Sequence, residues 1–166
     1  MKVLVTGGGG YVGNALCRDL LNRGYEVRCV DNFHKGQCDA LIALAKNPHF
    51  EFMYGDVTDV LQVQSMVQGI DGIIHLAAIV GFPDCKAQPA LSKVVNVQGT
   101  QNVIAMREWH NDTIPLVFAS TGSVYGKVEG VCTEESPLNA VSQYGADKLK
   151  AEQLVTQEEN TVSFRF

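Results

Sequence analysis

The chain alternates short apolar runs with longer segments in which apolar residues recur at helical spacing. Short runs of this kind are typical of buried strands. Strands are predicted at residues 2–6, 26–31, 50–54, 72–78, 115–120 and 161–166. Helices are predicted through Ala15, Leu16, Leu20 and Leu21 and near residues 39–46, 59–68, 90–109 and 142–158, with a loop at 79–89.

Strands that alternate with helices form a parallel sheet with helices on both faces. Because crossovers between parallel strands are right-handed, the predicted class is α/β, a doubly wound sheet in the order 3-2-1-4-5-6. A length of 166 residues suits one domain. The last predicted strand reaches the last residue, and we expect the chain to be the first part of a longer protein rather than a complete small domain.

Composition narrows the partners and the compartment. A net charge of −5 repels phosphate backbones, so we expect no nucleic-acid partner. No apolar run is long enough to span a membrane, and the first residues lack a signal-peptide pattern. The odd number of cysteines and the lack of C-x-x-C spacing argue against a disulfide framework and a zinc site, and favour a reducing cytoplasm. Several of the cysteines fall in apolar runs and are predicted to be buried; the full set is Cys17, Cys29, Cys38, Cys85 and Cys132.

The histidines give no sign of a metal site. His34, His49, His75 and His110 have no ligand spacing, and we expect no metal. His75 lies in an apolar strand and is predicted to be a core residue with satisfied hydrogen bonds.

The stretch TGGGGYVG, residues 6–13, stands between the first strand and the first helix. Its glycine spacing is weak evidence by itself, because most glycine-rich turns need no ligand. In this context Gly7 permits the tight turn, Gly10 lets the backbone approach a pyrophosphate, and Gly13 lets the helix pack close to the strand. The helix N-terminus offers free N–H groups and a partial positive charge. The sequence therefore predicts a dinucleotide site here.

Asp31 indicates which dinucleotide. It ends the second strand, about 20 residues after the turn, where a carboxylate can accept hydrogen bonds from the ribose hydroxyls and repel a 2′-phosphate. NAD is therefore favoured over NADP, although the nearby Lys35 could soften this discrimination. The alternative is that Asp31 and Asn32 only begin a turn.

Asp56 follows the third strand. There its carboxylate can meet the adenine amino group, and the backbone of Val57 can meet a ring nitrogen. The alternative is that Asp59 or Thr58 caps the next helix and Asp56 only shapes the loop.

The stretch SQYGADK places Tyr144 and Lys148 four residues apart, on one face of a predicted helix. A nearby ammonium favours the phenolate of a tyrosine, which is otherwise a poor base. This pair is common by chance, and its weight comes from following a dinucleotide turn. Ser120 and Thr121 end the fifth strand and are expected to face the cleft beside Tyr144, where a hydroxyl can bond the reacting oxygen. The alternative, that these hydroxyls satisfy turn backbone, suits Ser123 better than Thr121.

Together these motifs resemble the N-terminal half of an extended short-chain dehydrogenase/reductase of the NAD-dependent epimerase/dehydratase family. The matching stretches keep the family order over nearly the whole chain: TGGGGYVG (6–13), DNF (31–33), GDVTD (55–59), HLAA (75–78), NVQGTQN (96–102), STGSVYG (120–126) and YGADK (144–148). The resemblance implies a Rossmann fold, NAD as cofactor and a nucleotide-sugar substrate. The implied reaction, like that of a UDP-glucose 4-epimerase, is reversible: Tyr144 takes a proton from a sugar hydroxyl, NAD takes the hydride, and the hydride returns to the other face of the keto sugar.

The resemblance also implies residue roles. Thr121, Tyr144 and Lys148 are the expected catalytic residues. The backbones of Tyr11 and Val12 would touch the pyrophosphate. The full set of residues expected at the cofactor is Gly7, Gly10, Tyr11, Val12, Gly13, Asp31, Asn32, Asp56, Val57, Leu76, Ala77, Ala78, Asn96, Ser120, Tyr144 and Lys148.

One departure from the family favours an epimerase or a reductase. The 4,6-dehydratases place Asp-Glu after the catalytic threonine, and UDP-glucuronate decarboxylases place Ser-Glu there, whereas this chain has Gly122 and Ser123. Other sugar-nucleotide or steroid-type dehydrogenases, dehydratases and a non-catalytic dinucleotide-sensing module remain as alternatives. The family's C-terminal substrate domain is not within residues 1–166, which are expected to be an NAD-binding domain. The resemblance further implies a homodimer through the helices near 90–109 and 142–158.

Overall fold

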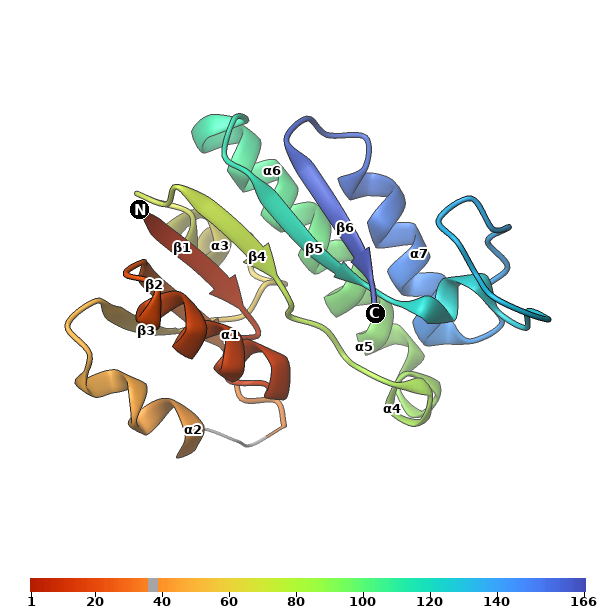
Figure 1. Ribbon diagram of the computed structural model, residues 1–166, viewed down its shortest axis with the longest axis horizontal. Coiled ribbons are helices and arrows are strands. Elements are labelled where there is room, and N and C mark those ends of the chain that lie inside the picture. The colour runs from red at the N-terminus through yellow and green to blue at the C-terminus, as the bar shows by residue number, and fades with distance from the viewer. Residues whose placement is uncertain (36–38) are drawn as a thin grey trace.

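The computed structural model describes residues 1–35 and 39–166. Its centre is a parallel sheet with the strand order β3-β2-β1-β4-β5-β6 (Figure 1). The strands are β1 (Lys2–Thr6), β2 (Glu26–Asp31), β3 (Phe50–Tyr54), β4 (Gly72–His75), β5 (Leu116–Ser120) and β6 (Thr161–Arg165). The predicted α/β class and strand order are both confirmed.

The helices follow the predicted alternation with one addition. They are α1 (Tyr11–Asn22), α2 (Asp39–Ile42), α3 (Val60–Met66), α4 (Phe82–Ala87), α5 (Pro89–Lys93), α6 (Gly99–Asn111) and α7 (Gln143–Val155). A π-helical turn, Val94–Gln98, joins α5 to α6, and short 3-10 turns lie at Leu44–Lys46 and Gly122–Tyr125. The predicted loop at 79–89 is wrong in part, because it contains α4. Pro83 sits in the first turn of α4, where its missing N–H breaks no helical hydrogen bond.

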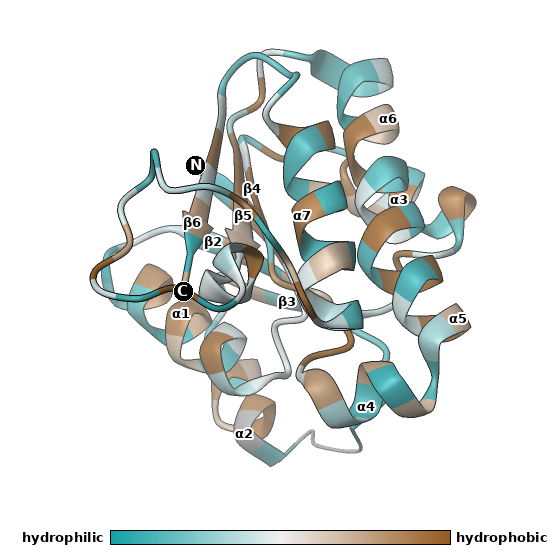
Figure 2. Ribbon diagram, turned by 90° about the vertical axis from the view of Figure 1, so that its right-hand side faces the viewer, coloured by the Kyte–Doolittle hydropathy of each residue, from teal (hydrophilic) through white to brown (hydrophobic). Residues whose placement is uncertain are grey.

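Two apolar cores lie on the two faces of the sheet. On one face, Cys17 of α1 and Leu44 pack against Val5 and Cys29 of the sheet. The other face is covered by α3, α6 and α7, whose buried residues surround Phe118 of β5. Figure 2 shows these helices on one side of the strands and α1 on the other. All six strands run the same way, so their carboxyl ends share one edge.

The α1 face of the sheet is covered unevenly. Val162 and Phe164 of β6 are 50% and 53% exposed, and they are in register with Val117 and Ala119 of β5. Within the described ranges no helix lies over this part of the sheet (Figure 1). An apolar strip therefore stays exposed at the β6 edge.

Three of the four cysteines that the structure describes are buried, as predicted. Cys17, Cys29 and Cys85 are buried, and Cys132 is exposed. Cys38 lies outside the described residues. Among residues 1–35 and 39–166, no helix is long and apolar enough to cross a membrane.

His75 is a satisfied core residue, as predicted. It is fully buried, and its ring nitrogens lie 2.7 Å from the Thr6 hydroxyl and 3.0 Å from the Thr100 hydroxyl. Burial, together with the charge of Lys148, lowers the pKa of His75 to about 3. Over residues 1–35 and 39–166 there is no cluster of three or more potential metal ligands.

Candidate active site

A cavity of about 760 Å³ opens at the carboxyl ends of the strands. Its size falls in the range of small-molecule sites, and its place is where open α/β sheets bind ligands. The predicted site residues that line it are Gly7, Gly10, Tyr11, Val12, Gly13, Asp31, Asn32, Asp56, Val57, Leu76, Ala77, Ala78, Ser120, Tyr144 and Lys148. Asn96 and Thr121 are the predicted residues that do not line it.

The glycine turn forms one wall of the cavity. Gly7 has a φ of +70°, and a Cβ there would lie 2.7 Å from the Ala77 nitrogen. A Cβ on Gly13 would press against the Gly7 carbonyl and lie 2.6 Å from the Gly8 Cα. These two glycines are required by the protein itself. Gly10 differs, because a Cβ there would meet only the Gly7 oxygen, at 3.2 Å.

The N-terminus of α1 faces the cavity with its N–H groups uncapped. Gly10 is the N-cap residue, no side chain bonds the first N–H groups, and the first turn holds no acidic residue. These donors and the positive end of the helix dipole suit a phosphate group.

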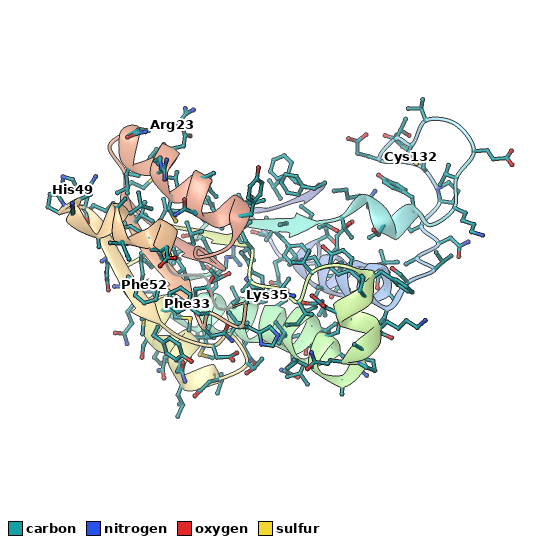
Figure 3. The ribbon with its side chains drawn as sticks, turned by 90° about the horizontal axis from the view of Figure 1, so that it is seen from below. Arg23, Phe33, Lys35, His49, Phe52 and Cys132 are labelled. Atoms are coloured by element: carbon teal, nitrogen blue, oxygen red, sulfur yellow. The ribbon has the colours of Figure 1, made fainter. Side chains whose placement is uncertain are left out.

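Asp31 is fixed by the glycine turn. Its Oδ2 accepts a hydrogen bond from the Gly9 N–H at 2.9 Å, and its Oδ1 accepts from the Phe33 N–H at 2.7 Å. Each carboxylate oxygen keeps a second lone pair for a ribose hydroxyl. Lys35, labelled in Figure 3, forms an ion pair with Asp84 of α4. Among the described residues, no Lys, Arg or His forms an ion pair with Asp31.

Asp56 makes hydrogen bonds within its own loop, as the alternative to a cofactor contact predicts. Its Oδ1 accepts from the N–H and the hydroxyl of Thr58, both at 2.8 Å, and its Oδ2 accepts from Asn32 at 2.9 Å. Burial opposes ionisation, but these hydrogen bonds outweigh it and lower the pKa of Asp56. Asp59 is the N-cap of α3. Asp56 still borders the cavity, so the loop bonds place its carboxylate there in ionised form.

Asn96 holds the loop that follows β4. Its side-chain amide bonds both backbone groups of Ile79, accepting from the N–H at 2.8 Å and donating to the oxygen at 3.0 Å. Asn96 is 1% exposed and lies in the π-helical turn. It therefore acts on the cavity through the loop of Leu76, Ala77 and Ala78, and direct contact with a cofactor stays a prediction.

Tyr144 and Lys148 enter the cavity from one face of α7. The helix begins at the N-cap Ser142, whose hydroxyl accepts from the Gly145 N–H at 3.0 Å. Burial raises the pKa of Tyr144, while a hydrogen bond with Thr121 lowers it, and the net direction is upward. Lys148 makes no contribution to this shift, and its effect on the Tyr144 phenolate stays a prediction. Thr121 itself is buried, and its hydroxyl also accepts from the Ser123 N–H at 3.2 Å.

Lys148 is almost completely buried. Its side chain is 2% exposed, and Nζ lies 3.9 Å from the centroid of the Phe118 ring. Burial lowers the pKa of Lys148 to about 7, while the charge of Glu152 opposes the change. At neutral pH this lysine is therefore close to its titration midpoint.

The Ser120 hydroxyl was expected to face the cavity beside Tyr144, but it is bonded elsewhere. Ser120 borders it, but its hydroxyl donates to the buried carboxylate of Glu152. Glu152 also binds Arg165 of β6, with Nη2 at 2.6 Å. Glu152 was missed as a residue of the site, although its spacing, four residues after Lys148, is a visible signal in the sequence.

The cavity wall includes further residues that the sequence patterns did not predict. Phe33, two residues after Asp31, has a φ of 52° and stacks on Phe52, with ring centroids 5.2 Å apart (Figure 3). Val80 and Phe166 also line the cavity. The DNF motif (31–33) was the sequence feature that could have indicated Phe33. Val80 and Phe166 belong to no such motif, and their place at the cavity depends on the path of the loop after β4 and of the residue after β6.

The strand order and the cavity at the strand ends are those of a Rossmann-like α/β protein. The model of the NAD dependent epimerase/dehydratase family matches residues 3–166. The chain belongs to this family.

Relatives agree with this assignment. UDP-glucose 4-epimerase 3 of Oryza sativa subsp. japonica is 34% identical over 94% of this chain and 44% of its own length. The solved UDP-Glc/GlcNAc 4-epimerase of Campylobacter jejuni is similar with a TM-score of 0.88 and 30% identity, over 94% of this chain and 48% of that one. The UDP-glucose 4-epimerase of Thermus thermophilus, solved in complex with NAD, gives a TM-score of 0.89 and 30% identity, over 99% and 54%. The chain thus spans about half the length of these relatives.

Proposed function

We propose that this chain is the NAD-binding part of a nucleotide-sugar 4-epimerase. The observation that carries the proposal is that Tyr144 and Lys148 line a cavity whose other wall is the glycine turn, while Thr121 lies behind the wall, hydrogen-bonded to Tyr144. A turn alone supports binding, whereas a tyrosine and a lysine facing the same cavity support proton transfer.

Each group has a role in the proposed reaction. NAD, when bound, supplies the acceptor and donor of hydride. Tyr144 takes the proton from the sugar hydroxyl, and Thr121 bonds the same oxygen and orients it. Lys148 in its charged form favours the phenolate of Tyr144. Gly10 and the N-terminus of α1 bind the pyrophosphate, and Asp31 binds the adenosine ribose.

The cofactor preference is proposed from Asp31. Its carboxylate would repel the 2′-phosphate of NADP. Lys35, the nearby cation that could soften this preference, pairs with Asp84. The geometry therefore supports NAD.

The reaction outcome is proposed from the two residues after Thr121. Gly122 and Ser123 offer no carboxylate for eliminating water, which supports epimerisation or simple oxidation over dehydration. The names of the relatives favour a UDP-sugar. Because the chain spans about half their length, we propose that the sugar is recognised largely by polypeptide outside residues 1–166.

The dimer also remains a proposal. The helices expected to form it, α6 and α7, pack on each other in this chain through one shared core that includes Ile104 and Ala151. Trp109 of α6 is 64% exposed. Sedimentation equilibrium is the test, and a concentration-independent monomer would contradict the proposal for this chain.

The activity is tested by supplying NAD and UDP-galactose to the chain and to any longer polypeptide that contains it. The expected products are UDP-glucose and no net reduced nicotinamide, with turnover lost in Tyr144→Phe. Accumulation of reduced nicotinamide would instead indicate a dehydrogenase. NAD binding with no turnover, unaffected by Tyr144→Phe, would favour a sensing module.

A further inference from the structure

Glu152 is a buried carboxylate on α7, one helical turn beyond Lys148. It is 4% exposed. Arg165 donates to its Oε1 from Nη2 at 2.6 Å and from Nε at 3.0 Å, and Ser120 donates to its Oε2. A buried carboxylate is strongly destabilising unless it is paired, and these partners supply that pairing and fix its position.

The same network reaches the elements that carry the candidate catalytic residues. Ser120 directly precedes Thr121 at the end of β5. Arg165 donates from Nη1 to the Tyr125 hydroxyl at 2.8 Å, in the 3-10 turn that Thr121 caps. Lys148 and Glu152 share one face of α7, since they are four residues apart. The network therefore connects β5, β6 and α7 directly behind the cavity.

The charges around Lys148 single out Glu152. Tyr144 and Glu152 face Lys148 from its own helix, and His75 faces it from β4, while β5 contributes the ring of Phe118. Because burial lowers the His75 pKa to about 3, His75 is neutral at physiological pH. Burial favours loss of the Lys148 proton, and the Glu152 carboxylate opposes that loss.

We propose that Glu152, held by Arg165 and Ser120, is a positioning residue that raises the cationic fraction of Lys148 beside Tyr144 near neutral pH. The inference rests on the proposed function, which gives the charged Lys148 its task. Glu152 does not line the cavity, so it acts through Lys148 rather than on the substrate. Its removal should therefore change the pH at which Lys148 works, not only the stability of the fold.

The test follows the protonation of Lys148 itself. Carbon-13 NMR of the chain labelled at lysine Cε gives its titration midpoint, with the signal identified by its loss in Lys148→Met. In Glu152→Gln we expect the midpoint to fall by about one unit, a tenfold change, since an opposite charge nearby shifts a pKa by about 1–3 units. Glu152→Asp, which keeps the charge, should return it toward the wild-type value. Glu26→Gln removes an exposed carboxylate on β2 and should leave it unchanged.

A second variant covers loss of folding. If Glu152→Gln unfolds, Glu152→Gln combined with Arg165→Gln removes both charges of the ion pair together. A smaller fall in the Lys148 midpoint is then expected, because loss of the more distant Arg165 cation offsets part of the loss of the Glu152 anion. The pH midpoint of NAD binding should fall in parallel. An unchanged or raised Lys148 midpoint in either folded variant overturns the role of Glu152. Failure of the wild-type chain to bind NAD, with the Lys148 shift intact, counts against the proposed function alone.

Discussion

Gly10→Ala separates what the glycine turn does for a ligand from what it does for the fold. At Gly10 the backbone angles, φ −72° and ψ 174°, suit any residue. A methyl group there meets only the Gly7 oxygen, at 3.2 Å. Replacing glycine by alanine at a compatible position stabilises a protein by about 0.4–1 kcal/mol, and the tight contact offsets part of this. The free energy of unfolding should therefore change by less than about 1 kcal/mol.

The same methyl group should weaken NAD binding strongly. It projects where the proposed pyrophosphate approaches the backbone N–H groups at the start of α1. A hydrogen bond to a charged group contributes about 1.5–3 kcal/mol, and loss of one raises the dissociation constant about tenfold or more. Gly13→Ala should behave differently: its methyl group would lie 2.6 Å from the Gly8 Cα, so it should destabilise the fold itself.

The assay pairs two measurements on each variant. Urea denaturation gives the free energy of unfolding, and isothermal titration calorimetry gives the NAD dissociation constant. Gly72→Ala is the matched control, because its methyl group, at the far end of β4, meets only the flexible end of Met1, at 3.4 Å. Wild-type NAD affinity in a folded Gly10→Ala would refute the placement of the pyrophosphate at this turn.

Three further predictions concern single ionisable residues. Burial lowers the Lys148 pKa from 10.5 to about 7. Between pH 7 and pH 10.5 the folded state therefore binds fewer protons than the unfolded state. Wild-type stability should rise with pH over this range. Lys148→Met should raise the free energy of unfolding at pH 7, by about 5 kcal/mol at most, and should remove the increase in stability with pH. Urea denaturation measures both, and a variant less stable than the wild type would contradict the prediction. The His75 pKa, lowered to about 3 by burial, means that wild-type stability should fall as pH drops from 6.5 toward 3, by up to about 1.4 kcal/mol per pH unit. His75→Gln should reduce that slope in denaturation curves at pH 4 and 7, and an unchanged slope would count against a neutral buried imidazole. Asp31→Asn removes the charge that repels a 2′-phosphate, so the ratio of NADP to NAD affinity should rise at least about tenfold in calorimetry; a constant ratio would show that Asp31 does not select the cofactor.

Local patterns were sufficient to predict the strands and their order, although the strand predicted at 72–78 ends at His75. The alternation of short apolar runs with helical spacing indicated all the strands, and right-handed crossovers then left the order 3-2-1-4-5-6 as the expected arrangement. The helix α4 was missed because two prolines near residues 79–89 suggest a loop, whereas Pro83 occupies a first-turn position where proline is tolerated. A proline marks a loop in some contexts and the first turn of a helix in others. The sequence alone does not distinguish the two until the start of the helix is known.

The candidate site was predicted where motifs lie next to the strands that position them. Gly7, Asp31 and Tyr144 reached the cavity because each follows or faces a carboxyl strand end. Contacts between distant segments could not be predicted in the same way. Glu152 accepts a hydrogen bond from the Ser120 hydroxyl, and Asp84 forms an ion pair with the Lys35 ammonium.

The proposed function depends most directly on NAD binding by the wild-type chain. Calorimetric titration with NAD and, separately, with NADP measures it without any assumption about the sugar. We predict one NAD site per chain and an affinity for NADP at least about tenfold lower, because Asp31 would repel the 2′-phosphate. No saturable binding of NAD, or tighter binding of NADP, would contradict the proposed cofactor site.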